Sequence, residues 1–236
     1  MDIKVIYEDS DLLVADKPAG IVVFPENNSL KSGETTLIDE LVQKYPELKN
    51  AGEAPRYGIV HRLDKDTSGI VLVAKSTETL IFLQKQFKNR GVEKKYICLV
   101  EGEIKDDFGE IKSFIARSPK DSRKQKVYSE SEPHPDSARE AVTEYKVLER
   151  YQNYTLLEVE IKTGRRHQIR CHFSYLKHPI AGDRLYAFKN SKIPEGLTRQ
   201  FLHASYLKIK LLNGQTHEFY SELPEDLKHV KIIRPV

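Results

Sequence analysis

Short apolar stretches separated by polar turn residues dominate the first hundred positions. IKVIYED and LLVADK alternate or run apolar on either side of Asp9-Ser10-Asp11, which predicts two strands joined by a tight turn. IVVFP (21–25) predicts a further extended segment, and GIVLVAK (69–75) and YICLVEG (96–102) predict buried strands. The N-terminal part of the chain is therefore expected to contain much β-structure.

Helical spacing of apolar residues occurs in only a few segments. Residues 36–45 (TLIDELVQKY) show it and stop before Pro46, so they predict a helix. A second helix is expected from Ser76, an N-cap residue, to Gly91, which ends it. RHQIRCHFSYL (166–176) predicts a third.

The second half of the chain is otherwise predicted to be β. EIKSFIAR, QKVYSE, AVTEYKVLER and YTLLEVEIK have strand patterns, and Tyr151-Gln152-Asn153 is expected to join the last two as a hairpin. A second hairpin is expected at Asn213-Gly214. No repeat or linker divides residues 1–236. The pattern indicates an α+β fold in one domain, with a mixed, mostly antiparallel sheet and a few packed helices.

Composition narrows the class of protein. With 236 residues and 39% hydrophobic content, the chain can bury a core without a disulfide or a metal. Cys98 and Cys171 lie in apolar runs and form no C-x-x-C pair, which argues against a disulfide framework or a zinc site. No signal peptide or long apolar run is present, so a soluble, cytoplasmic protein is expected.

Basic residues are clustered although the net charge is only +3. The clusters lie at 88–96, 117–126 and 162–170. If they share a face, they can follow a phosphate backbone. The alternative is that they are ordinary solvated faces of a charge-rich protein.

The sequence YGIVHRLDKDTSGIVLVAK (57–75) places two cations, a histidine and two carboxylates in a loop before a buried strand. Asp64 is held there on a rigid element, and a carboxylate so placed can act as a nucleophile or general base. Alternatively, Asp64 or Asp66 only accepts hydrogen bonds within the turn.

HRLDKDTSG resembles the central motif of the RluA-type pseudouridine synthases. Other segments are similar to that family's motifs in the same order: Lys17-Pro18-Ala19-Gly20, EKKYICLVEG (93–102), TGRRHQIRCHF (163–173), HPIAGDRLYA (178–187) and FLHASYLKI (201–209). Together they span nearly the whole chain. Members of the family often carry an S4 domain before the catalytic one, and here the first expected strand leaves no room for it.

The resemblance implies a pseudouridine synthase-like fold with a central RNA-binding cleft. The activity it implies is isomerisation of uridine to pseudouridine in structured RNA, without cofactor or metal. By motif position, Asp64 is the essential carboxylate and attacks either C1′ of the ribose or C6 of the base. Tyr96 stacks on the uracil, and Arg165 pairs with Asp64. A guanidinium can hold a carboxylate in bidentate geometry, and a tyrosine ring can stack on a base.

Further residues are expected to bind RNA or to support the site. Arg62 fills the space left by the flipped base or holds the backbone, and Arg166 adds a cation. The basic loop, defined as residues 118–126, is expected to contact RNA through Lys120, Arg123, Lys124 and Lys126. The supporting residues are His61, which orders the loop, His203, and His167 with Arg170, which lie on one helical turn near Arg165.

Two other classes of function remain open. A hydrolase could pair Asp64 with a second acid such as Asp183. A non-catalytic RNA-binding protein would need the basic segments but not the HRLD carboxylate. The substrate is ribosomal or transfer RNA, which the sequence does not separate, and a monomer is the expected state.

Overall fold

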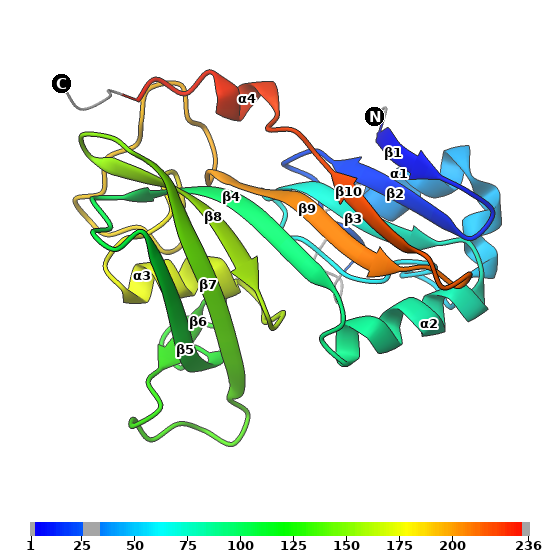
Figure 1. Ribbon diagram of the computed structural model, residues 1–236, viewed down its shortest axis with the longest axis horizontal. Helices are drawn as coiled ribbons and strands as arrows, with labels where there is room; N and C mark the ends of the chain where they lie inside the picture. Colours follow the sequence, from blue (N-terminus) through cyan, green and yellow to red (C-terminus); the bar gives the residue numbers. More distant parts are fainter. Residues whose placement is uncertain (1–2, 26–33, 233–236) are drawn as a thin grey trace. The chain divides into compact units, whose positions relative to one another are not determined.

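The computed structural model describes residues 3–25 and 34–232. They form two compact units. Unit 1 comprises residues 1–93 and 204–222, and unit 2 comprises residues 94–203 and 223–236, masked positions aside. Figure 1 labels the elements of both units. Within each unit, neighbouring strands of known register run antiparallel to each other. Helices accompany the strands in both units, so the predicted α+β class is confirmed.

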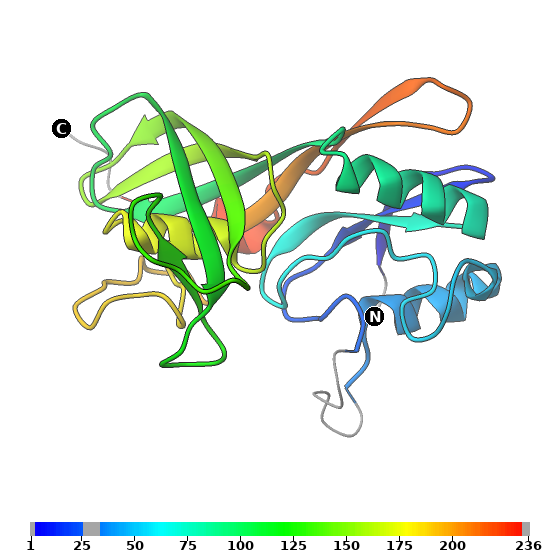
Figure 2. The same ribbon diagram turned by 90° about the horizontal axis from the view of Figure 1, so that it is seen from below.

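Unit 1 is a sheet with helices on both faces. Its strands are β1 (Lys4–Glu8), β2 (Leu12–Lys17), β3 (Ser68–Ala74), most of β9 (Leu202–Lys210) and β10 (Thr216–Tyr220). They are ordered β1-β2-β3-β9, and β10 pairs with β9. Its helices are α1 (Leu37–Lys44), the 3₁₀ helix η1 (Pro46–Asn50) and α2 (Thr77–Lys88). Figure 2 shows α1 and α2 on opposite faces of this sheet.

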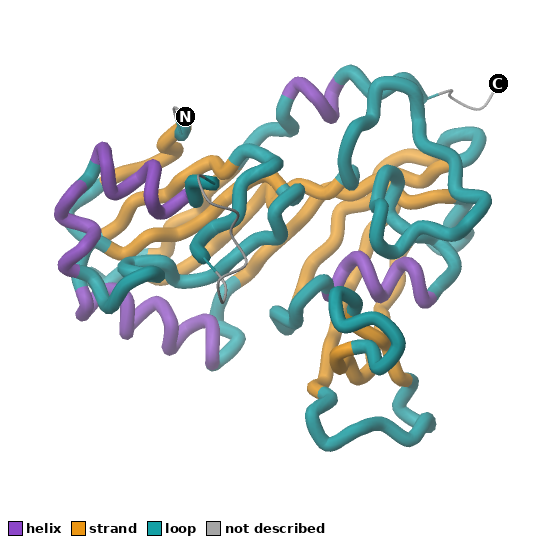
Figure 3. The backbone as a smooth tube through the Cα atoms, turned by 180° about the vertical axis from the view of Figure 1, so that it is seen from behind, coloured by secondary structure: helices purple, strands orange, loops and turns teal. Residues whose placement is uncertain are grey.

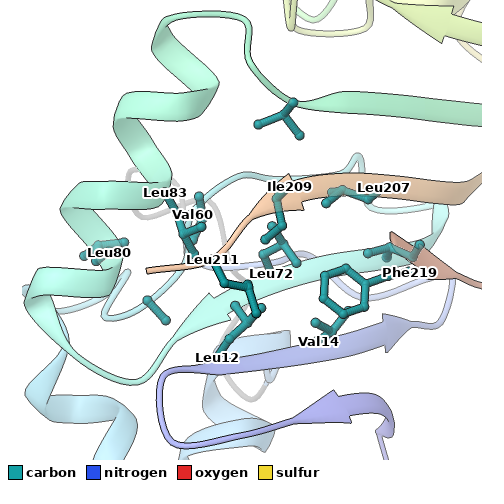
Figure 4. Close-up of a cluster of buried hydrophobic side chains, with 13 residues drawn as sticks. Leu12, Val14, Val60, Leu72, Leu80, Leu83, Leu207, Ile209, Leu211 and Phe219 are labelled. Atoms are coloured by element: carbon teal, nitrogen blue, oxygen red, sulfur yellow. The ribbon is translucent and has the colours of Figure 1, made fainter. Parts of the chain in front are cut away.

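One hydrophobic cluster of unit 1 lies between its sheet and α2. Leu80 and Leu83 of α2 pack on apolar residues of the sheet such as Leu72 and Ile209 (Figure 4). Val60, from the segment before the HRLD residues, is part of the same cluster. Burial of each large apolar side chain stabilises the fold by roughly 1.5–3 kcal/mol. The chain that enters the HRLD loop is therefore anchored in the core.

Unit 2 is built on a five-stranded antiparallel arrangement. Its strands, in the order β4-β8-β7-β5-β6, are β4 (Glu93–Glu101), β8 (Tyr154–Ile161), β7 (Arg139–Arg150), β5 (Phe108–Arg117) and β6 (Gln125–Tyr128). Helix α3 (Gln168–Tyr175) lies against these strands in Figure 3, and α4 (Glu225–Lys228) follows near the C-terminal end. Cys171 of α3 packs with Ile115 and Ala141 of the sheet.

Local sequence signals account for most element boundaries. The Ser76 side chain accepts from the Thr79 N–H at 3.1 Å and so caps α2, and Thr36 forms a capping box with Asp39 at the start of α1. Both predicted hairpins are present: β7 pairs with β8, and β9 pairs with β10 around Gly214, whose φ is +83°. These predictions are confirmed.

Two local predictions were wrong. Residues 21–25 do not form a strand, because the carbonyls of Val22 and Val23 instead accept from the N-terminal amides of α1. The third helix begins at Gln168 rather than at residue 166, since His167 adopts a left-handed backbone with φ 54°. Lys126 lies in strand β6, which confirms the strand predicted for QKVYSE, so the last two residues of the basic loop belong to that strand.

Candidate active site

The HRLD loop is fixed at both ends by unit 1. Before it, Val60 donates to the Leu72 carbonyl at 3.3 Å. At its tip, the Thr67 N–H donates to the Asp64 carbonyl at 3.1 Å, which closes a turn just before β3. The Asp64 side chain is half-buried, whereas Asp66 is exposed. A partly desolvated carboxylate on a hydrogen-bonded turn is suited to act on a bound substrate.

Lys17 ties the HRLD loop to β2. Its ammonium group is fully buried and donates to the carbonyls of Pro18, Ile21 and Lys65 at 2.8, 2.8 and 2.9 Å. The Lys65 carbonyl also accepts from the Gly20 N–H at 2.9 Å. An ammonium group has three protons to donate, so carbonyl oxygens can satisfy it where water is absent. Lys17 therefore fixes the residue that follows Asp64, a role that the sequence reasoning did not assign to it.

Gly69 allows another close approach within unit 1. Its φ is +114°, and a Cβ atom at this position would lie 2.2 Å from the Ala204 carbonyl oxygen. No other residue type fits without moving β9. The close approach of β3 to β9 at Gly69 and Ala204 therefore requires a residue without a side chain at position 69.

His61 and Arg62 lie on the way to Asp64 and make different contacts. The His61 Nε2 atom accepts from the Leu72 N–H at 3.1 Å, and its ring stacks on Phe87 with ring centres 4.9 Å apart. These contacts support the prediction that His61 orders the loop. The exposed Arg62 places its guanidinium carbon 5.3 Å from the centre of the Phe24 ring.

Tyr96 belongs to β4 in unit 2, opposite Val159 of β8. Its side chain is buried. Because side chains alternate along a strand, Lys94 shares its face. Lys94 is also buried, and burial lowers the pKa of its ammonium group while Glu160 acts in the opposite direction. A buried lysine therefore lies on the same face of β4 as Tyr96, and the sequence reasoning missed it although it begins the K-x-Y motif.

Arg165 is positioned through Gln168. The Gln168 side-chain oxygen accepts from the Arg165 N–H at 2.9 Å and from the Thr163 hydroxyl at 2.8 Å. Its amide donates to the Val142 carbonyl at 3.0 Å and to the Thr143 hydroxyl at 2.9 Å. The Arg165 Nε in turn donates to the Glu140 carbonyl at 2.8 Å. Buried polar groups so fully bonded hold a single conformation. Gln168 fixes the segment that carries Arg165. The sequence reasoning gave Gln168 no role, although its position within the TGRRHQIR motif could have indicated one.

Comparison with known proteins identifies the family. A family model described as RNA pseudouridylate synthase matches residues 11–175. The chain belongs to this family. An uncharacterized RNA pseudouridine synthase of Aquifex aeolicus is 45% identical over 236 residues, which are 97% of this chain and 72% of that protein. Ribosomal large subunit pseudouridine synthase D of Borreliella burgdorferi is 39% identical over 225 residues, 94% of this chain and 66% of that protein.

The fold agrees with this assignment. Human RNA pseudouridylate synthase domain containing 1 superposes with a TM-score of 0.75 at 26% identity, over 94% of this chain and 84% of that one. The family consists of isomerases that act on RNA, so the enzyme prediction is confirmed over a non-catalytic module. Among residues 3–25 and 34–232, no helix is long and apolar enough to cross a membrane.

The predicted catalytic residues of this synthase fall in both units. Asp64 lies in unit 1, and Tyr96 and Arg165 lie in unit 2. Each unit holds its own residues in place by the contacts above. The pairing of Asp64 with Arg165 and the central RNA-binding cleft stay predictions. His203 is buried at the start of β9, and its supporting role also stays a prediction.

Arg170 of the synthase forms a buried ion pair. Its Nε and Nη2 donate to the Asp183 carboxylate at 2.7 and 2.9 Å, and the Asp183 side chain is completely buried. The same carboxylate accepts from the Leu185 and Tyr186 amides. His167 is the N-cap residue of α3, and its carbonyl accepts from the Cys171 N–H at 2.9 Å in the turn that also contains Arg170. Its Nδ1 lies 3.0 Å from the Tyr186 hydroxyl.

The basic loop joins β5 to β6, and two of its four cations are already ion-paired. Arg123 donates to both oxygens of Asp121, and this hydrogen bonding lowers the pKa of Asp121 to about 2. Lys126 lies 3.1 Å from Glu132. Among the residues that the structure describes, neither Lys120 nor Lys124 forms an ion pair, and Arg166 is exposed.

A buried histidine extends the Gln168 network and makes a pH effect predictable. His172 bonds to the hydroxyls of Ser113 and Thr143 at 2.9 and 2.8 Å, and burial lowers its pKa to about 4. In the unfolded chain a histidine titrates near 6.5, so His172 stabilises the fold fully above about pH 6.5, and this contribution falls as the pH drops toward 4. The loss amounts to roughly 3 kcal/mol.

We expect the free energy of unfolding to fall less between pH 7 and pH 4 in His172→Gln than in the wild type. Chemical denaturation at several pH values measures this difference. The remaining titratable groups contribute equally to the pH dependence of unfolding in both proteins, so their contributions cancel in the comparison. Identical pH slopes for the two proteins would show that His172 is not held neutral by the fold.

Proposed function

We propose that this synthase converts uridines of ribosomal large-subunit RNA to pseudouridine. In this reaction the N1–C1′ bond breaks and the base is rejoined to the ribose through C5. The observation that carries the proposal is the rigid HRLD loop, in which Lys17 and the turn to Thr67 hold Asp64 half-buried. The name of the Borreliella relative supports ribosomal RNA over transfer RNA as the substrate.

In this proposal the two units form a single catalytic domain over residues 1–236. Asp64 attacks the ribose or the base, Tyr96 stacks on the uracil, and Arg165 binds the Asp64 carboxylate. Loops and bulges are the favoured substrate regions, because extruding a base costs a few kcal/mol and least where it is unpaired. The protein acts as a monomer in the cytoplasm.

The structure disfavours a glycoside hydrolase that uses Asp183 as its second acid. A catalytic carboxylate must reach the reacting bond or an attacking water. The Asp183 side chain is fully buried, and its oxygens accept from Arg170 and from two backbone amides. The Asp183 carboxylate therefore stabilises the fold and is not accessible to a substrate.

Within the basic loop, we expect Lys120 and Lys124 to contribute more to RNA affinity than Arg123 and Lys126. The last two must give up carboxylate partners before they can contact phosphate. In filter binding, Lys120→Ala with Lys124→Ala should weaken affinity and reduce the salt slope by roughly 1.4–1.8 for two phosphate contacts. The matched double variant of Arg123 and Lys126 should change both quantities less. The reverse order would show that the ion pairs open on binding.

The function is tested by pseudouridine mapping of total RNA from cells that lack the protein. Under the proposal, one or a few pseudouridines vanish from large-subunit ribosomal RNA and return with a plasmid-borne wild-type copy. Loss of sites only in transfer RNA would overturn the substrate, and loss of none would overturn the function.

A further inference from the structure

One tyrosine hydroxyl in unit 2 joins two segments that the proposed function uses. The Tyr186 Oη atom accepts from the Gln125 N–H at 2.7 Å, and the His167 Nδ1 atom lies 3.0 Å from the same oxygen. Gln125 is the first residue of β6 and lies near the end of the basic loop. His167 follows Arg165 by two positions. The hydroxyl therefore connects the basic loop with the turn that carries Arg165.

Tyr186 itself is held firmly. Its side chain is buried and packs with Cys171 of α3. Its N–H donates to the Asp183 carboxylate at 3.1 Å, and its carbonyl accepts from the Ser174 hydroxyl at 2.9 Å. A close-packed side chain whose backbone is hydrogen-bonded on both sides keeps one conformation. The hydroxyl is thus a fixed point from which a neighbouring segment can be positioned.

The segment on the other side of this hydroxyl has an unusual backbone. His167 has φ 54° and ψ 21°, in the left-handed region that residues with a side chain rarely adopt. Such a conformation persists where surrounding contacts hold it, and it is common at functional sites. The His167 and Tyr186 rings meet edge to face, with centres 5.7 Å apart and planes at 89°. If His167 relaxed to an ordinary backbone, the chain direction would change next to Arg165 and Arg166.

The link depends on the hydroxyl of Tyr186 and not on its ring. Burial raises the pKa of Tyr186, so the hydroxyl keeps its proton at neutral pH. Its oxygen accepts from the Gln125 amide, and its proton is available for the His167 Nδ1 atom. The ring has separate neighbours, since the Lys124 Nζ and Arg170 Cζ atoms lie 5.8 and 5.2 Å from its centre. A phenylalanine would keep those contacts and lose the link.

We propose that Tyr186 is a positioning residue for pseudouridine formation, because its hydroxyl holds the turn at 165–167 and with it the orientation of Arg165. This inference rests on the proposed function, in which Arg165 binds the Asp64 carboxylate. A guanidinium must be placed accurately to hold a carboxylate through two hydrogen bonds. Loss of the hydroxyl should therefore slow the reaction more than it weakens RNA binding.

The test compares the reaction rate and the RNA affinity of Tyr186→Phe with those of the wild type, on transcribed large-subunit ribosomal RNA. We expect the single-turnover rate at saturating enzyme to fall roughly 10- to 100-fold. The dissociation constant in filter binding should change by less than about twofold. His167→Asn removes the imidazole, and asparagine tolerates a left-handed backbone, so this variant should also react more slowly. A rate equal to that of the wild type in both variants, or a loss confined to affinity, would overturn the inference.

Tyr154→Phe is the matched control. It makes the same chemical change in unit 2, but the Tyr154 hydroxyl donates to the Lys192 carbonyl at 3.0 Å. Its rate should equal that of the wild type, and circular dichroism should show that every variant is folded. Equal rate losses in Tyr154→Phe and Tyr186→Phe would reduce the effect to a general loosening of unit 2 and overturn the positioning role.

Amide hydrogen exchange of residues 163–168, measured without RNA, separates this inference from the proposed function. The exchange should be faster in Tyr186→Phe than in the wild type, because the turn loses one of its contacts. Faster exchange in a protein whose wild type forms no pseudouridine would mean that the turn is held as proposed and that the function is wrong. Unchanged exchange would overturn the inference, and an active wild type would then leave the function standing.

Discussion

Asp64→Asn is expected to abolish pseudouridine formation while RNA binding remains. The amide has nearly the shape of the carboxylate but carries no charge, so it is neither a nucleophile nor a base at neutral pH. We expect the single-turnover rate to fall by at least about 10⁴-fold, which corresponds to about 5 kcal/mol of activation free energy. Release of tritium from 5-tritiated uridine in RNA measures this rate.

Asp66→Asn is the matched control for this experiment. It makes the same chemical change two residues away in the same turn, on an exposed carboxylate. Its rate should stay within a few-fold of the wild type. If Asp66→Asn lost as much activity as Asp64→Asn, the loss would come from the turn itself, and Asp64 would not be the reacting carboxylate.

Local signals made most of the fold predictable from the sequence. Strong turn residues such as Asn213-Gly214 and caps such as Ser76 fix boundaries through contacts only a few residues apart, and these predictions were confirmed. Predictions from local signals were wrong where a contact with a distant segment or an unusual backbone conformation determines the structure. Residues 21–25 have the composition of a strand, but their carbonyls bind the start of α1. His167 was counted as helical because its left-handed backbone leaves no trace in apolar periodicity.

The candidate site shows the same division. The charged residues of HRLD and its neighbours stood out in the sequence because they precede a buried strand. The family resemblance then indicated Asp64, Tyr96 and Arg165. The residues that hold these side chains were not visible, because their roles consist of long-range contacts. Lys17 binds a carbonyl 48 positions away, and Gln168 binds one 26 positions away. Lysine and glutamine residues in polar motifs are normally expected at the surface, so the sequence alone does not indicate that Lys17 and Gln168 are buried.

Removal of the buried carboxylate at Asp183 is expected to have the largest effect on stability. In Asp183→Asn the Arg170 guanidinium stays buried without a counter-charge, and breaking such a pair costs about 3–5 kcal/mol. For a chain of this size, Tm should fall by about 6–20 °C. Thermal denaturation followed by circular dichroism measures the change. The cost arises from desolvation, since replacing both partners together would leave no charge uncompensated.

Asp121→Asn separates burial from the loss of an ion pair as such. Asp121 binds Arg123 through two guanidinium nitrogens at 3.0 and 2.8 Å, nearly the geometry of Asp183 with Arg170, but the Arg123 side chain is 76% exposed. Water solvates that guanidinium when its partner is removed, so Tm should hardly change. Similar decreases in both variants would mean that the geometry of the pair, and not its burial, sets the cost. A large decrease for Asp183→Asn alone would establish that HPIAGDRLYA contributes its aspartate to the stability of unit 2.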